Sequence, residues 1–408
     1  MLLDITQFIV ELFSTYYLLI YIFIYGKYII GDFMKDYVYL DYSATTKPDS
    51  EVLKYFCNIC ENNYANPNSK HILGVKAHDV IDEASKIISN YFGVDSSEVI
   101  YTSGASEANN TVFKGVLDER RKHIITSSLE HSSVYGPLGY LQKKGYKVSI
   151  APIKKDGTIN ISKLEDMITD DTGLVSIVAV DSELGTRQPI EKIGKMLKKY
   201  PSVIFHSDIT QCVGKDNISL KDVDLASFSG HKIFCFKGIG GLIKKNSIKL
   251  NPLIHGGKSV TKYRSGTPQT ALIGALGKAF TLFNGNIDRN YDYVKKLNNM
   301  IIRHVDKYDK IKINSTSKAI PNVINMSFIG KNPNEIQKYF QDNKIIISTK
   351  TACSNDDGIS KSVYSITGDE MRAKSSVRIS LSYKTTEDEV CYLLKVIDKL
   401  MEEYDEIN

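Results

Sequence analysis

The sequence predicts an α/β fold whose larger part is a mainly parallel β-sheet covered on both faces by helices. From Tyr37 onward, short runs rich in β-branched and aromatic residues alternate with amphipathic stretches of helical length. This alternation is typical of parallel sheets, because each parallel pair of strands needs a long crossover connection, usually a helix. Beyond Phe283 a long helical stretch precedes further strands, which indicates a smaller α+β domain.

The expected elements follow one another in a regular order. The predicted strands of the larger part lie at Val38–Leu40, Val99–Thr102, Ile124–Ser127, Lys147–Ala151, Leu174–Val180, Val203–Asp208 and Asp224–Ser229. The predicted helices between them lie at Val75–Tyr91, Ser106–Leu117, Ser132–Lys144 and Ile190–Lys199. In the C-terminal part we expect a helix at Asp288–Tyr308, strands at Asn322–Phe328, Ile345–Thr349 and Ser376–Leu381, and a final helix from Thr386. Ligands of parallel sheets bind beyond the carboxyl ends of the strands, so the functional residues should follow strands.

Three segments are expected: a leader (residues 1–33), a large domain (34–283) and a small C-terminal domain (284–408). The leader holds an apolar run from Leu12 to Tyr25, shorter than the ~20 residues that a bilayer crossing needs. It also lacks the basic start and the cleavage site of a secretory signal. A membrane anchor, a poorly matched spanning helix and translated upstream sequence remain as interpretations. We favour the last, because Met34 directly precedes the first strand, and we therefore expect a cytoplasmic protein.

Composition narrows the classes of partner. The 408 residues carry 52 basic and 47 acidic side chains, a net charge of +5 that is spread along the chain without a basic stripe. We therefore expect no direct contact with nucleic acid. The six cysteines are too few and scattered for a disulfide framework, which fits a reducing compartment. Cys57 and Cys60 have metal-ligand spacing but fall inside a predicted helix without a second pair, so no metal site is expected.

The first candidate for chemistry is the segment Ser229-Gly230-His231-Lys232, directly after an apolar predicted strand. A lysine on a tight turn beyond a buried strand can have the lowered basicity that Schiff-base chemistry requires. Enzymes that use pyridoxal 5'-phosphate (PLP) hold their cofactor through such a lysine. An ordinary surface lysine is the alternative explanation for this segment taken alone.

Two further segments have the residue types that PLP needs. Asp208 ends a hydrophobic predicted strand, where a carboxylate could face the pyridine nitrogen, and Gln211 follows within reach of the phenolate oxygen. The segment Thr102–Glu107 links a strand to a helix with small residues. Such a turn lets backbone N–H groups and the helix dipole bind a phosphate, and Ser106 adds a hydroxyl donor. Capping roles are the alternative for both segments.

Taken in order, these segments resemble the cysteine desulfurase family, which belongs to the class V, fold-type I PLP enzymes. The resemblance runs from about Val38 to Leu400. The segments that carry it are Asp41-Tyr42-Ser43-Ala44-Thr45-Thr46, Gly104-Ala105-Ser106-Glu107, Glu130-His131, Asp208–Gln211, Ser229–Lys232, Arg264-Ser265-Gly266-Thr267 and Thr351-Ala352-Cys353-Ser354.

The resemblance implies a role for each cofactor residue. Lys232 would hold PLP covalently and later move the substrate's protons, and His131 would stack over the pyridine ring and assist acid–base steps. Asp208 would bind the ring nitrogen and Gln211 the phenolate oxygen. The implied phosphate ligands are Ala105, Ser106, Ser229 and His231. Thr267 would reach the phosphate of a partner subunit, which implies a homodimer.

The resemblance also implies the substrate and the sulfur chemistry. Asn66 and Arg378 would bind the carboxylate of L-cysteine, a task that suits the planar fork of arginine. Cys353 would attack the substrate sulfur, leaving L-alanine and an enzyme persulfide, and its polar loop fits a mobile nucleophile. The sulfur would pass to an acceptor protein, such as an iron–sulfur scaffold or a thiolation factor. His123, His206 and Cys212 are interpreted as packing residues.

Four segments depart from the family pattern and indicate a diverged member. Ser182 replaces an asparagine near the phenolate side; the other departures are Ser259-Val260-Thr261, Phe234-Cys235-Phe236 and Leu381-Ser382-Tyr383. Two alternatives stay open. A selenocysteine lyase or another class V PLP enzyme would turn over its substrate without Cys353. A degenerate homologue acting as a binding subunit would fold without binding PLP.

Overall fold

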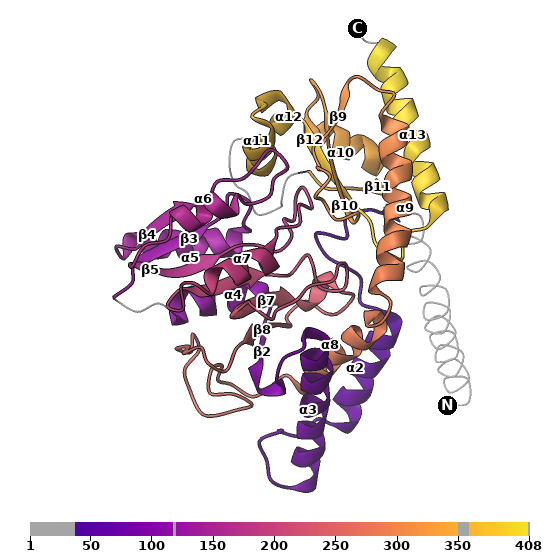
Figure 1. Cartoon of the computed structure of the whole chain (residues 1–408). Coiled ribbons are helices and arrows are strands. Elements are labelled where there is room, and N and C mark those ends of the chain that lie inside the picture. Colours follow the sequence, from indigo (N-terminus) through magenta and orange to yellow (C-terminus); the bar gives the residue numbers. More distant parts are fainter. Residues whose placement is uncertain (1–36, 117–119, 350–358, 407–408) are drawn as a thin grey trace, which may run out of the picture.

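A computed structural model describes residues 37–116, 120–349 and 359–406. The described chain forms a large sheet flanked by helices and a smaller α+β unit that holds the C-terminal helix (Figure 1). The leader at residues 1–33 lies outside the described residues. Among the described helices, none combines the length and the apolar character that a membrane crossing requires.

Seven strands form the large sheet, in the spatial order β2-β8-β7-β6-β5-β3-β4. Their bounds are β2 Val99–Thr102, β3 His123–Thr126, β4 Lys147–Ile150, β5 Thr172–Ser176, β6 Ile204–Asp208, β7 Leu225–Ser229 and β8 Gly240–Lys244. The pairs from β7 to β4 are parallel, whereas β8 runs antiparallel to both β7 and β2. The predicted α/β fold with a mainly parallel sheet is therefore confirmed.

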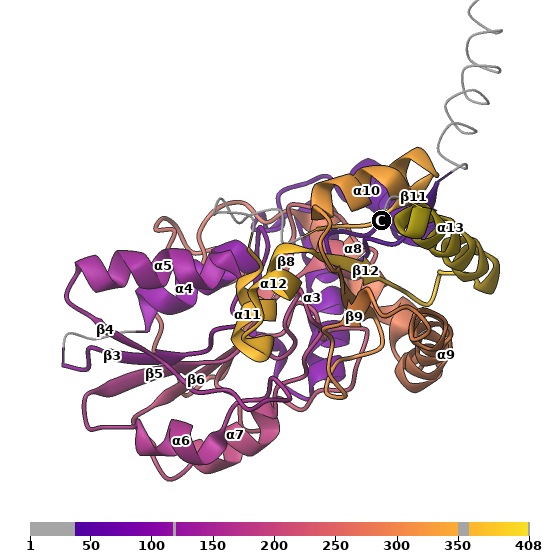
Figure 2. The same cartoon turned by 90° about the horizontal axis from the view of Figure 1, so that it is seen from above.

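Helices cover both faces of this sheet. Figure 2 shows α4 (Ala105–Gly115) and α5 (Ser132–Lys143) on one face, and α6 (Ile161–Asp166) and α7 (Ile190–Leu197) on the other. Helices α2 (Ser50–Asn62), α3 (Ile72–Phe92) and α8 (Thr270–Phe283) pack on one another, and α3 and α8 share the hydrophobic cluster of the α7 face. A short 3₁₀ turn, η1 (Ser96–Glu98), leads from α3 into β2.

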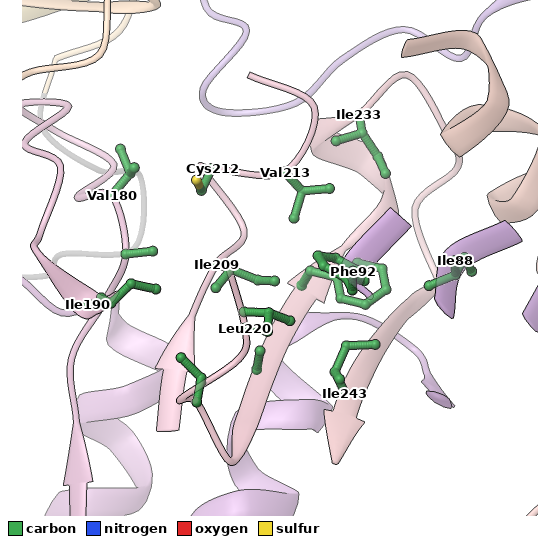
Figure 3. Close-up of a cluster of buried hydrophobic side chains, with 14 of the residues drawn as sticks. Ile88, Phe92, Val180, Ile190, Ile209, Cys212, Val213, Leu220, Ile233 and Ile243 are labelled. Carbon is green, nitrogen blue, oxygen red and sulfur yellow. The ribbon is translucent and has the colours of Figure 1, made fainter. Parts of the chain in front are cut away.

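The core on the α7 face anchors the segments that lead to the sheet's carboxyl edge. Ile209, Cys212 and Val213, which follow β6, are fully buried within it, as is Ile233 after β7 (Figure 3). The predicted packing role of Cys212 agrees with this position. Because these anchors flank Gln211 and Lys232 in sequence, hydrophobic burial fixes the two turns that carry those side chains.

The smaller unit is built on an antiparallel sheet in the order β12-β10-β9. Its strands are β9 Ile311–Ile313, β10 Val323–Phe328 and β12 Ser376–Ser380. Its helices are α9 Ile287–Val305, α10 Pro333–Asp342, α11 Lys361–Thr367, α12 Glu370–Lys374 and α13 Glu387–Glu406. Helices α9 and α13 contribute to the hydrophobic cluster on these strands.

The first strand, β1 (Val38–Tyr39), pairs in parallel with β11 (Ile345–Ile346). Leu40, which follows β1, is fully buried in the hydrophobic cluster of the smaller unit. The chain therefore passes from the smaller unit back across the large sheet immediately after Leu40. This crossing brings the segment Asp41–Thr46 to the carboxyl edge of the sheet, beside His231 and Lys232.

Candidate active site

A cavity of about 480 Å³ lies beyond the carboxyl ends of the parallel strands, between the large sheet and β12. Its volume falls in the range of ordinary small-molecule sites, roughly 300–1,000 Å³. The predicted site residues that line it are Ala105, Ser106, His131, Asp208, Gln211, Ser229, His231, Lys232 and Arg378. Asn66 and Thr267 are not among its lining residues, and Cys353 lies outside the described residues.

Lys232 ends the 3₁₀ turn η2 (Gly230–Lys232), which directly follows β7. Its Nζ donates hydrogen bonds to the carbonyl oxygens of Ser43, at 2.6 Å, and of Ala44. The segment after β1 therefore holds the amine at the cavity wall. The position agrees with a lysine that can reach a ligand in the cavity while its stem stays partly buried.

Asp208 ends β6 and is only 4% exposed. Its Oδ1 accepts a hydrogen bond from the Thr210 backbone N–H at 3.0 Å, and its Oδ2 accepts one from Asn109 Nδ2 at 2.9 Å. These two bonds fix the carboxyl plane. A carboxylate held in this way is pre-organised to meet a cationic ring nitrogen.

His131 is the N-cap residue of α5. Its Nδ1 accepts the Ser133 backbone N–H at 3.2 Å and lies 2.8 Å from Ser133 Oγ. Burial lowers the pKa of this imidazole; the negative charge of Asp208 opposes that shift, and the positive charge of Lys232 adds to it. Histidine at a helix N-terminus is disfavoured as a cation for the same reason that anions are favoured there.

Gln211 and Lys215 form a pair behind Lys232. Lys215 Nζ donates to Gln211 Oε1 at 2.5 Å, and Gln211 Nε2 donates to the Ser43 carbonyl at 2.9 Å. Because the Ser43 carbonyl can only accept, the amide is oriented with its NH₂ group toward Ser43 and its oxygen toward Lys215. Burial, together with the charges of Lys232 and Arg378, lowers the pKa of Lys215 to about 7.

The turn before α4 forms a cradle for an anion. Gly104 has a φ of +150°, a conformation that residues with a side chain rarely adopt. A Cβ on Gly240 of β8 would lie 2.7 Å from the Gly104 Cα, so glycine in β8 permits this close approach. Glu107 Oε2 accepts the Ser103 backbone N–H at 2.7 Å, which braces the turn. The helix N-terminus then faces the cavity beside Ser106 and Ser229.

Arg378, in the middle of β12, closes the opposite side of the cavity and is 3% exposed. Its Nη2 pairs with Asp41 Oδ1 at 2.8 Å, and its Nη1 donates to the Ser182 carbonyl at 2.9 Å. Its buried Nε has no hydrogen-bond partner among the described residues. The guanidinium is thus oriented by protein groups but keeps donors for a ligand carboxylate.

The remaining predicted ligands lie away from the cavity. Asn66 is exposed in the turn between α2 and α3, where its Oδ1 accepts the Asn68 backbone N–H at 2.9 Å. Thr267 is also exposed, on the segment that Arg264 ties to Glu107 through an ion pair of 3.1 Å. A role for either residue at this site therefore depends on a partner or on a movement of its segment.

Two buried acids beside the site favour their protonated forms. Burial raises the pKa of Glu130 to about 8, against hydrogen bonds from Ser127 Oγ and the Val178 N–H. Burial and the charge of Glu183 raise the pKa of Asp181 to about 7. Neither Glu130 nor Asp181 lines the cavity, whereas Asp208 does.

The arrangement of these groups fits PLP. The cradle at α4 suits a phosphate, the fixed carboxylate of Asp208 suits a pyridinium, and Lys232 provides the amine for a Schiff base. Arg378 lines the cavity, and its planar guanidinium suits the carboxylate of an amino acid. The volume has room for both molecules.

Comparison with known proteins identifies the family. Residues 38–393 match the family model described as aminotransferase class-V. Cysteine desulfurase IscS of Clostridium botulinum (strain Hall) is 34% identical over 385 residues, covering 92% of this chain and 97% of that protein. The chain belongs to the cysteine desulfurases of the class-V aminotransferase family. Cysteine desulfurase IscS of Buchnera aphidicola subsp. Baizongia pistaciae is 37% identical, covering 89% of this chain and 92% of that protein.

Solved structures of similar fold agree with this family assignment. A NifS-like protein superposes with a TM-score of 0.85 at 31% identity, covering 90% of this chain and 99% of that one. SspA in complex with cysteine superposes with a TM-score of 0.74 at 33% identity, covering 85% and 99%. Members of this family are PLP enzymes, so the predicted family and enzyme class are confirmed.

Sequence reasoning missed three residues that shape this desulfurase site. Asn109 binds Asp208, Lys215 binds Gln211 and Asp41 binds Arg378. Asn109 had a detectable signal, because it is a polar residue among the apolar inward positions of α4 (Ala108, Val112). Lys215 had none, whereas Asp41 belongs to the segment Asp41–Thr46 that carries the family resemblance, and only its pairing with Arg378 depended on the fold. Ser182, the departure at the phenolate side, contributes through its backbone carbonyl.

Proposed function

We propose that this protein converts L-cysteine to L-alanine and takes up the sulfur as a persulfide on Cys353. The observation that carries the proposal is the convergence of an amine, a carboxylate, an imidazole and a guanidinium on one cavity, through Lys232, Asp208, His131 and Arg378. The same four groups are what PLP chemistry on an amino acid requires. Membership of the cysteine desulfurase family favours cysteine among the amino acids.

Four residues would hold the ring of the cofactor. PLP, when bound, acts as an electron sink that allows the bond to the substrate sulfur to break. Lys232 would bind the aldehyde carbon and then carry protons, since its amine already lies at the cavity wall. Asp208 would keep the ring nitrogen protonated, and His131 would cover the ring. Gln211 would donate an amide hydrogen to the phenolate oxygen.

The phosphate would lie against the α4 N-terminus. Ala105 and Ser106 offer backbone N–H groups and a hydroxyl there, and Ser229 and His231 complete the cradle from the β7 side. Burial, reinforced by Lys232, lowers the pKa of His231 to about 4, so a neutral ring would donate one N–H. Thr267 would serve the phosphate of a second subunit, which is why we propose a homodimer.

The substrate carboxylate would pair with Arg378, with Asn66 as a second ligand once its turn closes on the site. The sulfur step needs a thiolate, and we assign it to Cys353. Ser348 lines the cavity, and Cys353 follows it by five residues, a stretch that can span up to about 17 Å. The C–S bond of cysteine breaks, an S–S bond forms on Cys353, and protons delivered to the carbon skeleton give L-alanine.

The persulfide would then pass to an acceptor protein, such as an iron–sulfur scaffold or a thiolation factor. We also propose that residues 34–283 and 284–408 act as the large and small domains, with the small one carrying the sulfur-transfer loop. A reducing, cytoplasmic setting suits this chemistry, because it keeps the Cys353 thiol free of disulfides.

The test is turnover of L-cysteine by a chain that starts at Met34, with a thiol reductant present to release sulfide. Wild type should give sulfide and L-alanine in equal amounts, and Lys232→Ala should give neither. Cys353→Ala should still bind PLP but lose sulfide release. Turnover by Cys353→Ala equal to wild type would contradict the sulfur role of Cys353, and absence of turnover in PLP-loaded wild type would contradict the function.

A further inference from the structure

A chain of buried polar side chains runs beneath the site, on the α4 face of the large sheet. In β5, β6 and β7, alternate residues point to the same face, and this places Ser176, His206 and Ser227 side by side under α4. All three are fully buried, as is Asn109 of α4 above them. His206 was interpreted as a packing residue, yet both of its ring nitrogens have hydrogen-bond partners.

The hydrogen bonds between these buried polar side chains are continuous from Ser176 in β5 to His131 at the cavity. Ser176 Oγ lies 2.9 Å from His206 Nδ1, and His206 Nε2 lies 3.1 Å from Ser227 Oγ. The Ser227 hydroxyl donates to Asn109 Oδ1. Asn109 Nδ2 then donates to Asp208 Oδ2 and to Ser133 Oγ, each at 2.9 Å. Ser133 Oγ finally lies 2.8 Å from His131 Nδ1.

The direction of each bond follows from counting hydrogens. Asn109 cannot turn its amide around, because its Oδ1 would then face the carboxylate of Asp208, and two acceptors would meet. Both hydrogens of its NH₂ group are therefore committed, one to Asp208 and one to Ser133. Since Ser133 Oγ accepts that hydrogen, its own hydroxyl hydrogen is left for His131 Nδ1.

The hydrogen bonds at the other end of this polar network, around His206, agree with this direction. The single hydrogen of Ser227 goes to Asn109, so the bond from His206 must use a proton on Nε2, and its Nδ1 accepts from Ser176. Burial lowers the pKa of His206 to about 4, which keeps this ring neutral as the count requires. The Ser133 backbone N–H, which can only donate, also faces His131 Nδ1 at 3.2 Å.

We propose that Asn109 is a positioning residue that, through the Ser133 hydroxyl, fixes His131 in the tautomer with its proton on Nε2. His131 then presents an N–H group, rather than a lone pair, to the cavity. In the proposed desulfurase reaction, on which this role rests, His131 would begin as a hydrogen-bond donor. It could accept a proton at Nε2 only after giving one away.

The tautomer can be read directly by ¹⁵N NMR of the full chain labelled at histidine, first without added cofactor and then with PLP. The protonated and unprotonated nitrogens of a neutral imidazole have well-separated ¹⁵N shifts, and His131→Gln assigns the signal among the eight histidines. Wild type at neutral pH should show Nε2 protonated and Nδ1 bare. A proton on Nδ1, or on both nitrogens, would overturn the proposal without recourse to any variant.

Asn109→Asp tests the positioning role because it keeps the shape of the side chain. The new carboxyl group would share one proton with Asp208, and its remaining lone pair would accept where the amide donated to Ser133. The Ser133 hydroxyl should turn toward the new carboxyl group, and its oxygen should then face His131 Nδ1 as an acceptor. We expect the tautomer ratio to move toward Nδ1–H by about tenfold, the change that one hydrogen bond supports. Asn110→Ala, on the outer side of the same helix, should leave the signal unchanged.

Ser133→Ala tests whether the effect of Asn109 on the His131 tautomer passes through the Ser133 hydroxyl or results from a general disturbance of the site. Without the hydroxyl, the backbone N–H alone holds Nδ1 as an acceptor, so the Nε2–H tautomer should remain the major form but by a smaller margin than in wild type. Adding Asn109→Asp to Ser133→Ala should then have no further effect on His131. An equal tautomer shift with and without the hydroxyl, or no shift in a folded Asn109→Asp, would refute the role of Asn109. Absence of cysteine turnover in wild type would contradict the proposed function but would not affect the conclusion about the His131 tautomer.

Discussion

Replacing Glu130 by glutamine should flatten the pH dependence of the protein's unfolding free energy. Glu130 is 8% exposed; its Oε1 accepts hydrogen bonds from Ser127 Oγ at 2.7 Å and the Val178 N–H at 2.8 Å. Its Oε2 has no hydrogen-bond partner among the described residues. A glutamine Oε1 can accept the same two bonds, and its NH₂ group would occupy the place of the protonated Oε2.

The magnitude follows from the pKa of Glu130, which burial raises from 4.5 to about 8. A folded-state pKa above the unfolded value means that the folded state binds more protons. The free energy of unfolding is therefore unaffected below pH 4.5 and falls as the pH rises toward 8. Integration of this proton uptake gives a loss of about 3 kcal/mol by pH 7, at ~1.4 kcal/mol per pH unit.

The assay is urea denaturation of the cofactor-free protein at several values between pH 5 and pH 8, for wild type, Glu130→Gln and the exposed control Glu61→Gln. Wild type and the control should lose about 3 kcal/mol of unfolding free energy across this range relative to Glu130→Gln. Parallel curves for wild type and Glu130→Gln would show that Glu130 is ionised when folded, which would refute the reasoning.

Three further outcomes are expected. Lys215→Met removes the amine that contacts Gln211 and should weaken PLP binding about tenfold in a spectroscopic titration. The control Lys192→Met, at an exposed position, should leave PLP affinity unchanged. Equal PLP affinities of wild type and Lys215→Met would contradict a role of Lys215 in orienting Gln211. Arg378→Lys keeps the charge but loses the fork and should raise KM for cysteine about tenfold or more with a smaller change in kcat, so an unchanged KM would exclude a carboxylate contact. Hydrogen bonds from Tyr308, Lys307 and His304 outweigh partial burial and lower the pKa of Asp398 to about 2. As the pH falls from about 4 to 2, wild type should therefore lose up to about 1 kcal/mol of unfolding free energy relative to Asp398→Asn, measured by denaturation. An identical loss in both proteins would show that protonation of Asp398 does not affect stability.

The parallel part of the sheet was predictable because its strands are short apolar runs and several of them are followed by a helical pattern. That regularity also placed Asp208 and Lys232 after strands, where the structure has them. The antiparallel strand β8 was missed. It begins with Gly240 and Gly241, which read as a turn, but a Cβ at Gly240 would lie 2.5 Å from the Phe228 carbonyl oxygen. Close packing against β7 therefore requires the residue type that hides the strand from a sequence pattern.

Pairings between distant segments could not be predicted. The strand Val38–Leu40 was expected among the strands of the larger part, but β1 pairs with β11, some 300 residues later in the chain. The same contact brings Asp41 to Arg378. Periodicity identifies which face of an element is buried but not its partner, so the groups that orient Arg378, Gln211 and Asp208 emerge only from the fold.

Reduction of the PLP-loaded protein with borohydride, followed by peptide mapping, identifies the amine that holds the cofactor. Three lysines adjoin the site: Lys232 and Lys237 line the cavity, and Lys215 lies behind it. The structure predicts that the added mass resides on the peptide containing Lys232 and that Lys232→Ala retains none. Modification of Lys215 or Lys237 instead, or a protein that takes up no cofactor, would contradict the account.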